Sequence, residues 1–139
     1  MSKLISTNPF TEELNTSFET LTREELSAKI DLAESAFQQW KKVPKSEKKA
    51  LFLKLADIME IRQKELAEIQ TQEMGMLFGY SFGGIGGTIK LTRWFANNFE
   101  TILANEIQSA EGMEFEYQYD PLGVIYGIAP WNFPFNQVL

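Results

Sequence analysis

The chain has 139 residues, of which 44% are hydrophobic and 23% charged, a composition typical of a folded protein with one core. Its net charge of −6 argues against a nucleic-acid partner, because an acidic surface repels a phosphate backbone. With no cysteine and no histidine, these residues offer no thiol nucleophile and lack the commonest general base. The longest apolar run, residues 122–129, falls far short of the roughly 20 residues that cross a bilayer. No signal peptide is visible, so we expect a cytoplasmic protein with no membrane partner.

The first 20 residues predict two short strands around a turn, over residues 4–6 and 14–18. Asn8 and Pro9 form the turn signal between them, since proline fixes its own φ and biases the preceding residue away from the helical region. Residues 22–25 then have the T-x-x-E form of a capping box. They precede an apolar stripe at helical spacing, which predicts a helix ending at Val43 and Pro44. The stripe consists of Leu26, Ile30, Ala33, Phe37 and Trp40.

A second helix is predicted from an N-cap at Ser46 to Met74, with Gly75 as its stop signal. Its predicted buried face is Leu51, Leu55, Ile58, Met59, Leu66 and Ile69. A third helix is predicted from about residue 80 to about residue 103. Its apolar positions are Ile85, Ile89, Phe95, Phe99 and Ile102.

The third helix carries a glycine cluster that has two interpretations. A phosphate-binding loop of the form G-x-G-x-x-G would need glycine at position 89, where Ile89 stands, and no G-K-[ST] follows. We therefore favour a structural role, in which Gly79, Gly83 and Gly87 let the helix approach a neighbour closely. A nucleotide-binding glycine loop stays as an alternative, and alanine at Gly86 and Gly87 would test it by abolishing nucleotide binding.

Two sets of carboxylates have simpler explanations than catalysis. Glu73 precedes the glycine that ends the second helix, which favours a helix terminus over a functional carboxylate. Glu111, Glu114 and Glu116 include a period-two pair, which indicates the solvated face of a strand more than an acid pair. We predict no metal site.

The closing stretch carries the main functional signal. Residues 105–112 are expected to form a loop, and alternation from Glu114 to Tyr119 predicts a strand with one wet face. After a Pro-Leu-Gly corner, residues 124–129 are wholly apolar apart from glycine, which predicts a strand buried on both faces in a parallel sheet. Ligands in such sheets bind beyond the carboxyl ends of the strands. Asn132 lies there, between Pro130 and Pro134, and is a candidate hydrogen-bond donor to a ligand.

A structural interpretation of this stretch is equally open from the residues alone: Trp131 fills a gap in the core and Asn132 caps the following turn. Residues 135–139 start a helical turn and then stop, and one parallel strand cannot pair alone. We therefore expect the chain to be the front piece of a longer one.

Residues 121–134 resemble the P-L-G-V … P-W-N-F-P signature of the NAD(P)-dependent aldehyde dehydrogenase superfamily. Supporting resemblances run along the whole chain. Residues 8–12 are similar to an N-P-x-T-G opening, with Glu12 in place of glycine, and residues 36–40 to an A-F-x-x-W helix. Residues 73–76 are similar to E-M-G-K, with Met76 in place of lysine. Residues 133–138 are similar to the F-P-x-x-Q-V of the succinate-semialdehyde dehydrogenase branch.

The resemblance implies an α/β fold class, the N-terminal part of the aldehyde dehydrogenase fold, with helices on a Rossmann-like parallel sheet and strands of an oligomerisation hairpin. Residues 1–112 are then the helical part of the cofactor-binding domain. Residues 113–126 supply the hairpin strands, and residues 124–139 supply the first strand of the cofactor sheet with the start of the next helix.

The resemblance also implies a reaction and its residues. An aldehyde, succinate semialdehyde or a similar small semialdehyde, is oxidised to the acid with NAD or NADP through a cysteine thiohemiacetal. Asn132 is the implied oxyanion stabiliser. The implied cofactor-binding residues are Ile128, Ala129, Pro130, Trp131 and Asn132.

Several parts of that machinery are implied to lie beyond residue 139. They are the nucleophilic cysteine, the general-base glutamate, the lysine that binds the cofactor ribose and the glycine-rich phosphate turn. We therefore expect the 139-residue chain alone to be inactive and the full-length enzyme to be a homo-oligomer, a dimer or a tetramer. The alternative is a non-catalytic product of a truncated or split gene that acts at most as an interaction module. The reading frame beyond codon 139 separates the two.

Overall fold

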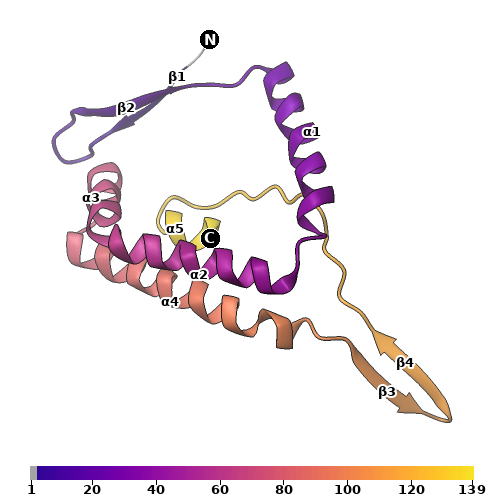
Figure 1. The fold of residues 1–139 in the computed structure, drawn as a ribbon. Helices are drawn as coiled ribbons and strands as arrows, with labels where there is room; N and C mark the ends of the chain where they lie inside the picture. The colour runs from indigo at the N-terminus through magenta and orange to yellow at the C-terminus, as the bar shows by residue number, and fades with distance from the viewer. Residues whose placement is uncertain (1–2) are drawn as a thin grey trace.

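The computed structural model describes residues 3–139 as a layer of three helices with a separate helix and two β-hairpins around it (Figure 1). Helix α4 lies along α2 and also packs on α3, while α1 stands apart and the β3–β4 hairpin projects away. No helix within residues 3–139 is long and apolar enough to cross a membrane. The elements are β1 (Lys3–Thr7), β2 (Leu14–Glu19), α1 (Arg23–Trp40), α2 (Lys45–Ile61), α3 (Gln63–Met74), α4 (Phe78–Ile102), β3 (Glu106–Ala110), β4 (Met113–Tyr117) and α5 (Pro134–Val138).

The predicted N-terminal strand pair is confirmed. Strands β1 and β2 are antiparallel, with Ile5 opposite Ser17. The side-chain oxygen of Asn8 accepts hydrogen bonds from the backbone N–H groups of Phe10 at 2.9 Å and Thr11 at 3.3 Å, which closes the turn. Within this turn Glu12 has φ 62, a left-handed conformation that favours glycine.

The helix boundaries follow the capping signals in part. The capping box of α1 is confirmed: the Thr22 N–H donates to Glu25 Oε2 at 2.8 Å, and the Glu25 N–H donates to Thr22 Oγ1 at 3.2 Å. The predicted N-cap at Ser46 is wrong, because the N-cap of α2 lies two residues earlier, at Pro44, whose φ is already close to helical. Gly75, with φ 69, ends α3 as predicted.

The single helix predicted from Ser46 to Met74 is wrong. Arg62, with φ −98 and ψ 10, divides it into α2 and α3. The break lets both helices pack on α4, so the apolar face of each meets the same neighbour. Periodicity cannot show such a break, because the apolar spacing continues across it.

The core lies between α2, α3 and α4, with Phe135 of α5 packed against its edge. It consists of Ala56, Met59, Ala67, Ile85 and Ile89. Three residues of the predicted buried face of the second helix are exposed instead: Leu51, Ile58 and Ile69. Phe95 and Ile102, two apolar positions of the predicted third helix, are exposed as well. The α1 stripe lies at helical spacing, yet no α1 residue is buried. These faces are apolar without a covering layer among the described residues.

The glycine cluster lies inside the continuous helix α4, so it forms no phosphate loop. Residues 3–139 supply no neighbour for the predicted close approach at Gly79, Gly83 and Gly87, because a β-carbon at each would meet nothing within 4 Å. The close contact is instead at Gly86, where a β-carbon would lie 2.9 Å from Gln63 Nε2.

The predicted loop over residues 105–112 is wrong, because residues Glu106–Ala110 form β3 and pair antiparallel with β4. Glu111 and Gly112 both have positive φ, 54 and 79, as a two-residue hairpin turn requires. Every residue of both strands is exposed. Strand β4 therefore has solvent on both of its faces, whereas one solvated face was predicted. The hairpin therefore begins at residue 106, ahead of the predicted boundary at 113.

Residues 118–133 form neither helix nor strand, which differs from the strand predicted over residues 124–129. A parallel strand needs a neighbour to pair with, and none of the described elements lies beside this segment as a strand. The helical turn predicted to start near residue 135 is confirmed as α5.

Candidate functional site

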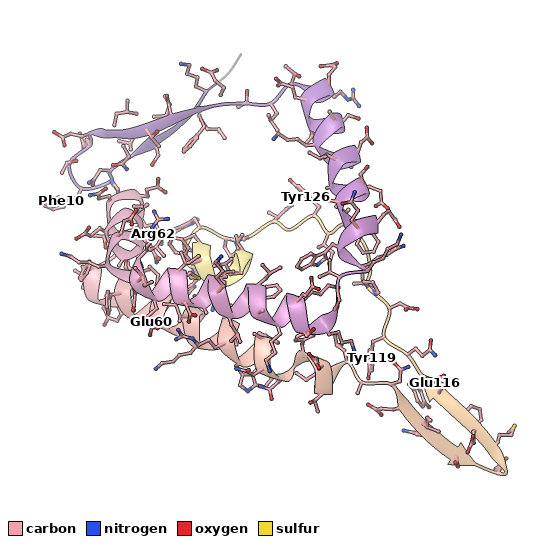
Figure 2. All side chains as sticks on the ribbon, in the orientation of Figure 1. Phe10, Glu60, Arg62, Glu116, Tyr119 and Tyr126 are labelled. Carbon is pink, nitrogen blue, oxygen red and sulfur yellow. The ribbon has the colours of Figure 1, made fainter. Side chains whose placement is uncertain are left out.

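The candidate site begins at Gly123, where the chain turns beside the C-terminal half of α1. Gly123 has φ 102, which a residue with a β-carbon adopts only under strain. The Phe37 ring lies 3.9 Å from where that β-carbon would be. From this corner the segment passes between α1 and α5 as extended chain, with Tyr126 along it (Figures 1 and 2).

Helix α5 fixes the other end of the segment on the helical layer. Pro134 begins the helix, and Phe135 is partly buried against the core. Phe133 and Phe135 face a small gap lined also by Gly84, Ile85 and Thr88 of α4. The turn before α5 is therefore seated on α4.

Gln70 of α3 lines the same gap and is 5% exposed. Its side-chain nitrogen donates to Met76 Sδ at 3.4 Å, a weak acceptor. The sequence did not predict this packing contact between Gln70 and the turn before α5. The signal that could have indicated it is a glutamine three residues after Ala67, on the apolar face of a helix.

Asn132 lies in the turn immediately before α5 and is exposed. Its side chain makes no hydrogen bond to any residue within 3–139, so its N–H groups are free to donate. The N-cap of α5 is Phe133 and α5 has no side-chain cap, so Asn132 does not cap this helix. Trp131 is 75% exposed and fills no gap in the core. The structural interpretation of both residues is therefore wrong.

Two of the predicted cofactor-binding residues, Ile128 and Ala129, line an open hollow of about 440 Å³. The segment curves over α5 here, so residues about ten positions apart share one wall. Pro130, Trp131 and Asn132 follow directly in the chain but are not part of the lining. The hollow is lined by Ile125, Gly127, Ile128, Ala129, Gln137 and Val138.

The hollow fits one wall of a dinucleotide site. No charged side chain lines it, and its lining residues are apolar or glycine apart from Gln137, which suits the flat faces of a cofactor, although a substantial part of the exposed wall is polar. The backbone groups of residues 118–132 make no backbone hydrogen bond to the described residues, which leaves them free for a ligand. No lysine or arginine lines the hollow, so the phosphates would need partners from elsewhere.

The shifted pKa values lie in ion pairs of the helical layer, away from this segment. Arg93 Nη2 lies 2.8 Å from Asp57 Oδ1 and 2.7 Å from Glu60 Oε2, and the hydrogen bond from Arg93 lowers the pKa of Glu60. A hydrogen bond from Arg62 similarly lowers the pKa of Glu65. Both Glu60 and Arg62 are labelled on the helical layer in Figure 2. Within residues 3–139 no group of three or more metal-ligating side chains comes together.

The helical layer, the two hairpins and the closing turn have the arrangement of the N-terminal part of the aldehyde dehydrogenase fold, as superposition on solved structures shows. The aldehyde dehydrogenase family model matches residues 2–139, and the chain belongs to this family. It is 34% identical over 131 residues to a Synechocystis protein named a probable succinate-semialdehyde dehydrogenase for NADP(+). It is 31% identical over 132 residues to the NADP(+) succinate-semialdehyde dehydrogenase of Deinococcus radiodurans.

The aligned regions cover 94% and 95% of this chain but 29% and 28% of these relatives. Solved structures agree. The structure of Gox0499 superposes with a TM-score of 0.94 at 28% identity, over 99% of this chain and 30% of that chain. The succinic semialdehyde dehydrogenase of Streptococcus pyogenes, solved with NADP+, gives 0.91 at 26% identity, over 96% and 30%. The chain thus spans less than a third of the proteins it resembles.

Proposed function

We propose that this chain supplies the oxyanion donor and one wall of the cofactor site in an NAD(P)-dependent aldehyde dehydrogenase. The observation that carries the proposal is the free, exposed amide of Asn132, three residues along the chain from Ala129 in the wall of the hollow. The substrate class is a small semialdehyde, with succinate semialdehyde favoured by the names of the Synechocystis and Deinococcus relatives.

The chemistry needs a donor in this place. When a cysteine thiolate from outside these 139 residues adds to the aldehyde carbon, the carbonyl oxygen takes the negative charge. The side-chain N–H of Asn132 donates a hydrogen bond to that oxygen and stabilises the charge. Removing one such donor typically lowers the rate by about 10²–10³. NAD(P), when bound, accepts the hydride that leaves the substrate carbon.

A donor of this kind must be held in place before the reaction. Pro130 and Pro134 restrict the backbone on either side of Asn132. Phe135 anchors the following turn on the core. Ile128 and Ala129 then offer apolar side chains to the cofactor, and Pro130 and Trp131 follow them directly in the chain. The backbone that carries the Asn132 amide is therefore restricted before the reaction begins.

The β3–β4 hairpin supports the proposal of a homo-oligomer. It projects from the helical layer, and Ile107, Phe115 and Tyr117 are 70%, 45% and 51% exposed. A two-stranded hairpin is marginally stable alone, so such strands usually pack on another surface. We assign the oligomer contact to residues 106–117, with residues 3–105 as the helical part and residues 118–139 as the cofactor segment.

The experiment uses a fused enzyme, in which Leu139 is joined to the part of the Synechocystis relative that follows its aligned region. Growth of absorbance from NADPH is measured with succinate semialdehyde, for the fused enzyme and for the 139-residue chain alone. We expect turnover only in the fused enzyme, because the chain contains no cysteine. An inactive but folded fused enzyme, or turnover by the chain alone, would contradict the proposal.

A further inference from the structure

The corner between α1 and α2 carries the densest positive charge of the chain. Residues 41–49 contain five lysines and one glutamate, although the chain as a whole has a net charge of −6. The corner is tight, because the Val43 N–H donates to the Trp40 carbonyl oxygen at 3.1 Å and α2 begins directly after Pro44. The end of α1 and the first turns of α2 therefore bring their lysines to one place.

Three of these lysines, Lys41, Lys45 and Lys48, line a hollow of about 400 Å³, which we call the corner hollow. Its size is in the range of small-molecule sites. It shares no lining residue with the hollow that contains Ile128 and Ala129, so it lies outside the proposed cofactor site.

Two of the lysines are positioned by aromatic rings that do not neutralise them. Lys41 Nζ lies 5.4 Å from the centroid of the Phe37 ring, and Lys48 Nζ lies 5.3 Å from the centroid of the Trp40 ring. Such a contact attracts an ammonium group and leaves its full charge in place. Among residues 3–139, no ion pair includes Lys41, Lys45 or Lys48. Their three positive charges are therefore available to an anion.

The rest of the corner hollow is mostly apolar. Phe99 and Leu103 come from the C-terminal end of α4, and Tyr119 and Pro121 come from the chain that leaves the β3–β4 hairpin (Figure 2). These side chains suit a flat, ring-bearing group. Asp120 is the one carboxylate in the lining, so three ammonium groups and one carboxylate give the lining a net charge of +2.

We infer that the corner hollow binds a phosphate monoester with a ring-bearing body, its phosphate on the lysines and its ring on the apolar wall. A phosphate monoester carries a charge of about −1.5 to −2 at pH 7, which matches the lining. A carboxylate carries a single charge and leaves one positive charge unmatched. Lysine binds phosphate as a point charge, so Lys41, Lys45 and Lys48 can each meet a separate phosphate oxygen.

The test is isothermal titration calorimetry of the 139-residue chain with phenyl phosphate as the probe. Inorganic phosphate has the charge without the ring, and benzoate has the ring with a single charge. We expect phenyl phosphate to bind with one site per chain and at least about tenfold more tightly than either, and added salt to weaken its binding. Equal affinity for benzoate would overturn the assignment to phosphate, and equal affinity for inorganic phosphate would overturn the role of the apolar wall.

The discriminating variant combines Lys41→Gln with Lys45→Gln, because both side chains are exposed and neither belongs to the core. Its affinity for phenyl phosphate should fall about tenfold or more. Lys29→Gln with Lys90→Gln is the matched control: it removes the same charge at two exposed lysines outside the corner hollow and should change the affinity less than about twofold. Circular dichroism verifies that both variants keep their helices.

A second variant tests the ring contact independently of the lysines. Tyr119 is 52% exposed, so Tyr119→Ala should leave the fold intact and reduce the affinity for phenyl phosphate to that for inorganic phosphate. No binding of phenyl phosphate by the parent chain, or an equal loss in the two lysine variants, would overturn the inference. The titration measures binding and not turnover, so its result does not depend on the proposed oxidation of an aldehyde.

Discussion

Gln63 reaches across from α3 to cover Gly86 of α4. Its side-chain nitrogen donates to the Phe82 carbonyl oxygen at 2.8 Å and lies 2.9 Å from the point where a β-carbon on residue 86 would be. This contact explains why position 86 is glycine. At the other glycines of the cluster, a β-carbon would meet none of the described residues within 4 Å.

Gly86→Ala and Gly87→Ala should therefore differ in stability, although both replace a helical glycine. At position 87 the β-carbon meets open space, so alanine should stabilise the helix by up to about 1 kcal/mol. At position 86 alanine displaces the Gln63 amide, and losing its hydrogen bond costs about 1 kcal/mol and offsets the gain. Urea unfolding of the 139-residue chain measures both. Adding Gln63→Ala should remove the difference, and equal stabilities with Gln63 present would contradict this account.

Glu12→Gly should stabilise the β1–β2 hairpin. Glu12 has φ 62, which costs a residue with a β-carbon about 1 kcal/mol or more, while glycine adopts it freely. Part of that gain is lost to the greater freedom of glycine in the unfolded chain, so we expect about 0.5 kcal/mol net. The midpoint of urea unfolding reports it. Glu13→Gly, whose φ is not positive, is the control and should destabilise the hairpin.

Acidification should weaken the joint between α2 and α4. The hydrogen bond and charge of Arg93 hold the pKa of Glu60 below its ordinary value of 4.5. A carboxyl with a lowered pKa in the folded state stabilises the fold above its unfolded pKa, and this contribution disappears as the pH falls through the folded pKa. Arg93→Gln should thus be less stable than the parent chain at pH 7, by an amount that shrinks below pH 4.5. The effect is small because the pair is solvated. A stability difference that is constant from pH 7 to the acid side of 4.5 would rule out this coupling.

Phe135 should act on catalysis without touching the substrate. Its ring anchors the turn that holds Asn132, and a displacement of about 1 Å can cost as much as 10²-fold in rate. In the fused enzyme Phe135→Ala should lower kcat about tenfold or more. Phe135→Leu, whose side chain still packs against the core, should retain most of the kcat. A circular dichroism spectrum identical to that of the parent is the control for folding. Equal kcat in all three proteins would show that the anchor is unnecessary.

Local signals along the chain predicted much of the fold. The capping box at Thr22, the turn at Asn8 and the stop at Gly75 involve residues close in sequence, and the structure has all three. The break at Arg62 and strand β3 escaped prediction for different reasons. The apolar period continues through Arg62, and β3 depends on a Glu111-Gly112 turn whose first residue lacks the usual turn chemistry.

Non-local features were the ones that sequence could not predict. The apolar runs of α1 and of residues 124–129 indicate burial, but burial depends on what lies opposite, and the described residues do not cover them. The candidate site also has a part that was predicted and a part that was not. The sequence motif predicted Asn132 and its neighbours, whereas the contact of Gln70 and Thr88 with the turn depends on how α5 packs on the helical layer.

The most direct test of the proposed role of Asn132 is the kcat of the fused enzyme carrying Asn132→Ala. Asn136→Ala, at an exposed asparagine one helical turn further on, is the matched control. If Asn132 stabilises the oxyanion, kcat for succinate semialdehyde falls about 10²–10³-fold, the KM for NADP changes little, and the control keeps the parent's kcat. A kcat for Asn132→Ala equal to that of the parent would contradict the account.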